Sequence, residues 1–123
     1  MAVKEIRIPS ADHPITIEPY KGRVIVKSDG RIIADSRATL VLREASYPPV
    51  HYIPRKDVNM TLLERTAHAT YCPYKGDASY FSVPLLGAGA ANAVWTYEKP
   101  YEAVAPIESH LAFYPDRVEI TEE

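Results

Sequence analysis

The sequence has too few cysteines for a disulfide framework or for a metal site built on thiolates. Cys72 is the single cysteine in 123 residues. One thiol excludes an intramolecular disulfide and a structural zinc site made of several thiolates. Because free thiols persist in reducing compartments, the lone cysteine favours a cytoplasmic location.

Long apolar runs and an excess of basic residues are also lacking. No run approaches the ~20 residues that span a bilayer, and the N-terminal segment carries an early acid, Glu5, in place of the apolar centre of a signal peptide. Lysine and arginine number 14 against 16 acids, a formal net charge of -2. Because phosphate neutralisation dominates affinity for nucleic acid, this balance argues against such a partner. We expect neither membrane nor nucleic-acid binding.

Recognisable patterns for metal ions and phosphate groups are missing too. The histidines are scattered, and none pairs with another at i, i+4 spacing around an acid. Lys75-Gly76 lacks the two-glycine frame of a phosphate-binding loop, and Asp77 follows where serine or threonine would hold magnesium. We therefore expect no metal and no cofactor.

Prolines and tyrosines, in contrast, are abundant, at 11 and 9 residues. Prolines at this density interrupt helices and central strands. Tyrosines favour strands, pockets and interfaces. The length fits one domain over residues 1–123. Together these features predict a single, mainly β domain with one or two short helices.

Short alternating segments predict the individual strands. The candidate strands cover residues 15–18, 23–27, 31–34, 38–44, 78–83 and 92–97. Asp29-Gly30 predicts a hairpin turn, and residues 110–114 and 117–120 are expected to form a terminal hairpin. Asp57 as an N-cap predicts a helix over residues 58–65. A helical turn is expected in residues 100–106 and a loop of small residues in 85–91.

Residues 70–76, Thr-Tyr-Cys-Pro-Tyr-Lys-Gly, are expected to form a turn that joins the helix to a strand. Lys75 can stabilise a thiolate on Cys72, and His68 can act as its base if the backbone bends back. The alternative is that Cys72 is a small buried hydrophobe. Lys75 either points to water or holds an anion among aromatic rings.

Residues 52–57 and 95–97 also place polar and aromatic groups in irregular, proline-rich surroundings, and we expect them to converge with residues 70–76 on a ligand pocket. The expected ligand-binding residues are Tyr52, Arg55, Thr70, Lys75, Trp95 and Tyr97, and Tyr71, Tyr74 and Tyr80 are further candidates for the wall. The candidates for catalysis are Cys72, His68 and Asp57, although Asp57 fits an N-cap better. Arg43 and Glu44, at the end of a strand, are expected to face solvent or to pair with each other.

These segments resemble the family called domain of unknown function 427. The resemblance rests on residues 33–38, 52–58, 70–80, 93–97 and 112–114, in the family's order within about residues 20–120. Its most specific parts are the Cys-Pro-x-Lys-Gly stretch at 72–76 and the Tyr-x-Pro-x-x-Asp-Val stretch at 52–58. The resemblance implies a β-tent-like set of bent antiparallel sheets. The family also carries a nucleotidyltransferase label, which no phosphate loop or metal-binding acid pair supports here.

Three functions follow from these patterns. The first is a pocket for a small anionic or aromatic ligand. The second is a non-catalytic interaction module or homodimer whose tyrosines form the contact. The third is a thiol enzyme or redox sensor that uses Cys72. The sequence does not decide whether the protein is an enzyme.

Overall fold

The computed structural model describes residues 4–84 and 91–123 and confirms the predicted mainly β fold. The strands are β1 (Ile15–Pro19), β2 (Val24–Ser28), β3 (Arg31–Ser36), β4 (Leu40–Glu44), β5 (Val50–Tyr52), β6 (Glu64–Cys72), β7 (Gly76–Ser82), β8 (Val94–Thr96), β9 (Leu111–Phe113) and β10 (Glu119–Glu122). The helical elements among the described residues are short 3-10 turns: η1 (Arg55–Asp57), η2 (Met60–Leu62) and η4 (Glu102–Ile107). The last of these confirms the helical turn expected near residues 100–106. None of the described helical elements is long and apolar enough to cross a bilayer.

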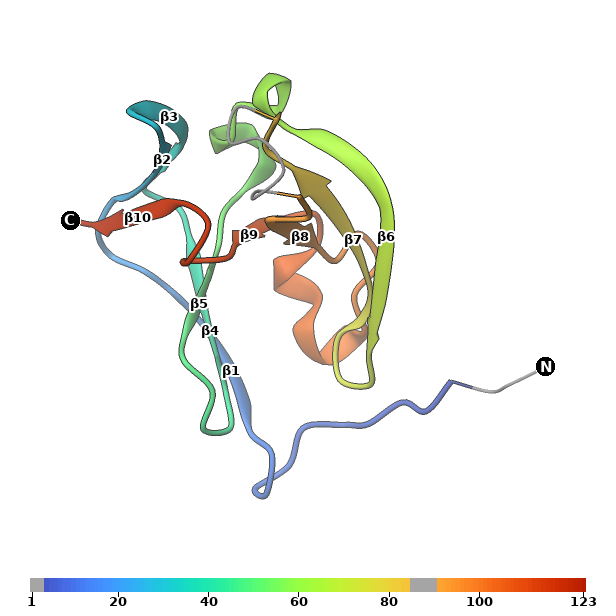
Figure 1. Ribbon diagram of the computed structural model, residues 1–123. Coiled ribbons are helices and arrows are strands. Elements are labelled where there is room, and N and C mark those ends of the chain that lie inside the picture. Colours follow the sequence, from blue (N-terminus) through green and yellow to red (C-terminus); the bar gives the residue numbers. More distant parts are fainter. Residues whose placement is uncertain (1–3, 85–90) are drawn as a thin grey trace.

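The strands form three antiparallel sheets, in the orders β1-β4-β5, β10-β2-β3 and β6-β7-β8-β9. Figure 1 shows β1, β4 and β5 running along one side of the molecule, while β6 and β7 curve along the other. Ile53 and Leu111 join these two sides through a reciprocal pair of backbone hydrogen bonds, each 2.8 Å long. The first and third sheets are therefore fixed to one another just beyond β5.

The β2–β3 hairpin has the turn that the sequence predicts. Asp29 and Gly30 both have positive φ, at 49° and 79°. Two successive residues of this kind match the twist of the flanking strands. The predicted hairpin is confirmed.

Two clusters of buried side chains form the interior. The apolar cluster contains Val24, Val26, Ile33, Ala34, Ile53, Val58, Phe81, Val83, Ala93, Val94, Leu111, Phe113 and Val118. The tyrosine cluster contains Leu42, Tyr52, Ala78, Tyr80, Tyr97, Val104, Ile107 and Ala112. Both clusters take buried side chains from β7 and β9. Neighbouring residues of one strand, such as Tyr80 and Phe81 in β7, belong to different clusters, so the two clusters lie on opposite faces of this sheet.

The helix expected over residues 58–65 is wrong. Val58 is extended, with φ -110° and ψ 134°, and it forms a bridge with Ala34 that buries its side chain in the apolar cluster. Asn59 then caps a single 3-10 turn by accepting a hydrogen bond from the Thr61 amide at 3.2 Å. Tertiary pairing thus overrides the weak helical preference of this segment. Asp57 caps no helix, and its carboxylate instead accepts a hydrogen bond from Ser36 Oγ at 2.6 Å.

Two expectations about strand connections are also wrong. The terminal segments form no hairpin with each other, because β9 pairs with β8 whereas β10 pairs with β2 in another sheet. Ile120 lies opposite Val26 and packs on the apolar cluster, which draws β10 away from β9. The turn expected over residues 70–76 is shorter, since β6 extends to Cys72 and β7 begins at Gly76. It joins two strands of one hairpin. The loop expected at 85–91 falls largely outside the described residues.

Candidate functional site: a cavity lined by aromatic side chains

A cavity with two adjoining compartments lies beside the tyrosine cluster. The larger compartment has a volume of about 520 Å³. Its lining is Glu44, Tyr47, Pro48, Pro49, Val50, His51, Ile53, Cys72, Lys75, Trp95, Phe113, Tyr114, Pro115 and Ile120. The smaller, of about 220 Å³, is lined by Leu42, Glu44, Tyr47, Pro48, Val50, Tyr52, Lys75, Tyr80, Trp95, Tyr97 and Tyr114. Segments that are far apart in the sequence therefore converge here.

Trp95 forms the central wall of this cavity. It lies in β8 and borders both compartments. Its indole N–H donates a hydrogen bond to Tyr52 Oη at 3.2 Å, and the two rings meet edge to face with their centroids 6.4 Å apart. On the other side, the Tyr114 ring lies 4.5 Å from the Trp95 ring. These contacts hold the indole in place while part of it stays accessible from the cavity.

Three buried phenols line the smaller compartment. Tyr52, Tyr80 and Tyr97 are 2%, 7% and 7% exposed. Tyr80 Oη lies 2.9 Å from Thr70 Oγ1, with either atom able to donate. Burial raises the pKa of Tyr52 and of Tyr97 well above the ordinary tyrosine value. Tyr52 and Tyr97 therefore stay protonated and present hydroxyl groups that can both donate and accept.

A largely buried ion pair closes one side of the cavity. Lys75 Nζ donates to Glu44 Oε1, and each side chain is 12% exposed. His13 Nε2 lies 2.7 Å from Glu44 Oε2 and donates to it. Burial opposes the ionisation of Glu44, but the hydrogen bonds from Lys75 and His13 outweigh it and hold the pKa of Glu44 below its ordinary value. Lys75 contributes one positive charge and Glu44 one negative charge, so the ion pair adds no net charge to the cavity wall.

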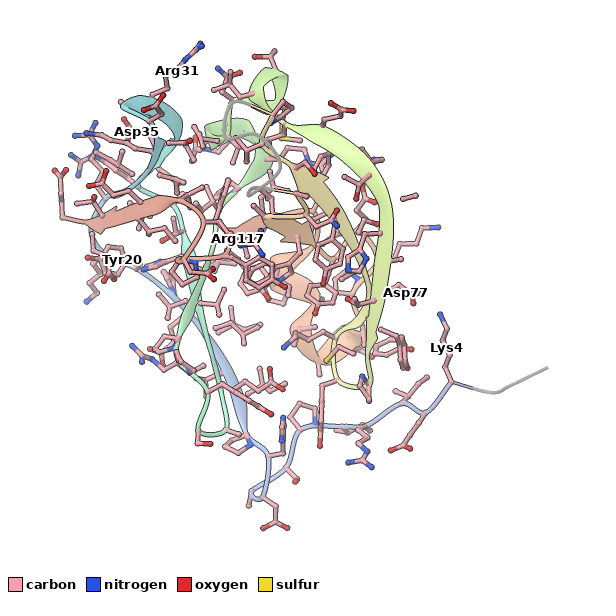
Figure 2. All side chains as sticks on the ribbon, in the orientation of Figure 1. Lys4, Tyr20, Arg31, Asp35, Asp77 and Arg117 are labelled. Carbon is pink, nitrogen blue, oxygen red and sulfur yellow. The ribbon has the colours of Figure 1, made fainter. Side chains whose placement is uncertain are left out.

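The N-terminal segment carries His13 to this ion pair. Lys4 Nζ lies 2.7 Å from Asp77 Oδ1 at the β6–β7 end of the molecule, where Figure 2 labels both side chains. The Arg7 amide donates to the Pro73 carbonyl at 2.9 Å. His13 itself stacks flat on Tyr74, with ring centroids 4.0 Å apart. The segment thus follows the β6–β7 turn.

Sequence reasoning missed Glu44. The expectation that it faces solvent or pairs with Arg43 is wrong, because the carboxylate points inward to Lys75 and His13. The alternation within β4 contained the signal: Leu42 is buried and Arg43 exposed, so Glu44 lies on the same face as Leu42. The strand therefore directs the carboxylate toward the interior.

The structure brings together six of the residues that the sequence indicated. The smaller compartment is lined by Tyr52, Lys75, Tyr80, Trp95 and Tyr97, and Cys72 lines the larger one with Lys75 and Trp95. Thr70 reaches the cavity only through its hydrogen bond with Tyr80. Of the other tyrosines considered, Tyr71 bonds to Tyr101 at 2.7 Å and Tyr74 stacks on His13.

The remaining candidates lie apart from the cavity lining. Arg55 Nη2 is 3.6 Å from Glu98 Oε2, and its guanidinium lies over the Phe81 ring. His68 packs edge-on against Tyr80, with ring centroids 4.5 Å apart. In the part of the chain that the structure describes, no hydrogen bond joins Cys72 to His68. Within that same part, no three or more His, Cys, Asp and Glu side chains gather where they could hold a metal ion.

The motifs at residues 52–58 and 72–76 lie within a region that matches a known family. A family model described as Domain of unknown function (DUF427) matches residues 16–123. The chain belongs to this family. The predicted resemblance is confirmed, and every residue that lines the cavity falls within the family region. His13 precedes that region, so its contact with Glu44 is made by a segment outside the family match. No curated protein matches the chain in sequence.

Proposed function

We propose that the protein binds a small, planar aromatic ligand in the cavity beside Trp95. The observation that carries this proposal is the convergence of Tyr47, Trp95 and Tyr114 on both compartments. Aromatic faces favour offset or edge-to-face contact with another ring. The larger volume, about 520 Å³, lies within the range of about 300–1,000 Å³ that is typical of small-ligand sites.

The exposure of aromatic side chains at the cavity mouth supports the same proposal. Tyr47 is 64% exposed and Tyr114 is 38% exposed, and both adjoin prolines that also line the cavity. Large apolar side chains left accessible around a concave surface mark an interaction site. Phenol hydroxyls deeper inside supply the few polar groups that orient a ligand.

The proposal is one of binding and includes no reaction. Cys72 borders the larger compartment, but activation of a thiol requires a neighbouring base or cation. His68, the base that the sequence suggested, packs against Tyr80, and the Lys75 ammonium is engaged by Glu44. Cys72 is therefore assigned to the wall of the site.

The experiment that tests this proposal uses Trp95 as the probe. Trp95 is the single tryptophan of the chain, so its indole N–H gives one assignable signal in a ¹H–¹⁵N spectrum. Titration with benzamide should shift that signal in a saturable way. The shift should disappear in Val50→Phe, because Val50 lines both compartments and a larger ring there fills them.

Ile32→Phe is the matched control. Ile32 is 49% exposed on β3, and the same added ring there should leave the titration unchanged. If benzamide leaves the indole signal of the folded wild-type protein unchanged at millimolar concentration, the proposal is wrong. An equal response of wild type and Val50→Phe would also overturn it.

A second candidate function, a homodimer or protein-interaction module, is favoured by the exposure of Tyr47. Aromatic residues are enriched at protein interfaces. Sedimentation of the wild type and of Tyr47→Ser separates the two functions. A dimer that dissociates on this substitution supports the interaction module, and a concentration-independent monomer removes the homodimer.

A further inference from the structure

The ammonium group of Lys75 is a cavity cation whose charge is already compensated. It borders both compartments, and it donates to Glu44, whose other carboxylate oxygen accepts from His13. Both members of the ion pair are 12% exposed. The charge pattern that a ligand meets is therefore that of an ion pair, with no net positive charge.

This pairing makes a singly charged ligand unfavourable. A ligand carboxylate that binds Lys75 brings a second anion to a single ammonium group, so one of the two carboxylates, that of the ligand or that of Glu44, is left without a compensating charge in the cavity. Breaking a buried pair and leaving one charge uncompensated is strongly destabilising. A ligand cation that takes Glu44 leaves Lys75 in the same position. An uncharged ligand avoids both penalties because the pair stays intact.

The polar groups around the ion pair offer hydrogen-bond donors, so they favour a ligand that carries a hydrogen-bond acceptor. An ammonium group has three donors and no acceptor, so Lys75 retains donors beyond the one given to Glu44. The protonated Tyr97 hydroxyl lies in the same compartment. Both Glu44 oxygens already accept hydrogen bonds. A carbonyl oxygen on the ligand would satisfy these donors without disturbing the pair.

We infer that Glu44 is the specificity-determining residue of the cavity, and that it selects uncharged aromatic ligands with a carbonyl acceptor over aromatic carboxylates. This inference rests on the proposed binding function and departs from the anionic ligand that the sequence allowed. In this account, Lys75 is a hydrogen-bond donor held by Glu44, and the aromatic walls supply the remaining affinity.

Three probes of nearly equal shape and different charge test the inference: benzamide, benzoate and benzamidinium. Affinities are measured at neutral pH from the Trp95 indole signal. Wild type should bind benzamide tighter than either ion by about tenfold, which corresponds to ~1.4 kcal/mol. Glu44→Gln leaves Lys75 uncompensated, so benzoate should become the tightest of the three. Lys75→Gln leaves Glu44 uncompensated, so benzamidinium should become the tightest.

Glu98→Gln is the control for the first variant. Glu98 is also paired, with Arg65 Nη2 at 2.7 Å, but it lies outside the cavity lining. The same substitution there should leave the order of the three probes unchanged. Glu44→Gln and Lys75→Gln each predict a different change in the preferred probe, so either variant that folds tests the selection by Glu44.

Two failures can be told apart. If none of the three probes binds the wild type, the proposed function is wrong. If the probes bind but wild type prefers benzoate or benzamidinium, or if the preference of wild type is unchanged in either cavity variant that folds, the proposed binding function is retained and the selection by Glu44 is wrong.

Discussion

The two clusters of the interior differ in chemistry although β7 and β9 contribute buried side chains to both. The buried members of the apolar cluster are hydrocarbon side chains, with Val24 and Val26 at 0% exposure. The tyrosine cluster contains Tyr52, Tyr80 and Tyr97 and adjoins a cavity. The smaller compartment lies beside the phenols of the tyrosine cluster, whereas Ile53 and Phe113 are the two buried members of the apolar cluster that reach the larger compartment.

The difference follows from what each side chain requires when it is buried. Hydrocarbon groups gain from close packing alone. A buried hydroxyl group needs a hydrogen-bond partner. Tyr52 finds one in Trp95 and Tyr80 finds one in Thr70, while Tyr97 borders the cavity. The comparison indicates that the apolar cluster mainly supplies stability, whereas the tyrosine cluster supplies the phenol hydroxyl groups of the proposed site.

The largest effect on stability is expected from the apolar cluster. Ile33 is 1% exposed, and Ile33→Ala should lower the free energy of unfolding by about 2–5 kcal/mol through lost burial and a residual cavity. Urea denaturation measures the loss. Benzamide binding by the folded fraction should remain. A loss below about 1 kcal/mol would show that this cluster does not carry the stability.

The next effect concerns the ion pair at the cavity. Lys75→Met leaves the Glu44 carboxylate buried, and full burial would cost about 3–5 kcal/mol. Because His13 still bonds to Glu44 and the pair is slightly exposed, we expect a smaller loss of about 2 kcal/mol, below the range for full burial.

A double-mutant cycle completes this test. Adding Glu44→Gln to Lys75→Met removes the uncompensated charge and should restore part of the loss. Denaturant unfolding of the four proteins gives the coupling energy. Strict additivity of the two single changes would contradict a direct interaction between these side chains.

Acid should weaken the same pair. The folded pKa of Glu44 lies below its unfolded value, so the stabilisation is present above the unfolded pKa of about 4.3 and is lost as pH falls through the lower, folded pKa. Glu44→Gln should therefore lose less stability than wild type on acidification below about pH 4.5. Thermal unfolding across this range measures both slopes, and identical slopes would contradict the ionised, paired state of Glu44.

The smallest effect is expected from a single hydroxyl group of the tyrosine cluster. Tyr52→Phe removes the acceptor of the Trp95 indole N–H and should cost about 1 kcal/mol, the usual net value of one hydrogen bond. The fluorescence emission maximum of Trp95 should also shift when this hydrogen bond is lost. The control is Tyr47→Phe at the exposed mouth, where stability should not change. An unaltered Trp95 spectrum in Tyr52→Phe would mean that this hydrogen bond does not orient the indole.

Local patterns predicted the β class, the hairpin at Asp29-Gly30 and the family. They failed where pairing between segments far apart in the sequence determines the secondary structure. Val58 leaves the helical pattern because it pairs with Ala34, and β10 pairs with β2 because Ile120 packs on the apolar cluster. Nothing near these residues in the sequence specifies such partners.

The candidate site divides in the same way. The concentration of aromatic and polar groups pointed to Tyr52, Lys75, Trp95 and Tyr97, which share one compartment. The partner of Lys75 could not be read from its own segment, because Glu44 lies 31 positions away. The charge of the cavity depends on that pairing. The sequence therefore indicated the location of the proposed site but could not predict the charge of the ligand that it favours.

The most direct test of this account is a crystal structure of the protein with benzamide. We expect the benzamide ring against Trp95, its carbonyl oxygen within hydrogen-bond distance of Lys75 Nζ, and the Lys75–Glu44 pair intact. Benzamide on any other surface, or a benzamide group that separates Lys75 from Glu44, would contradict the account.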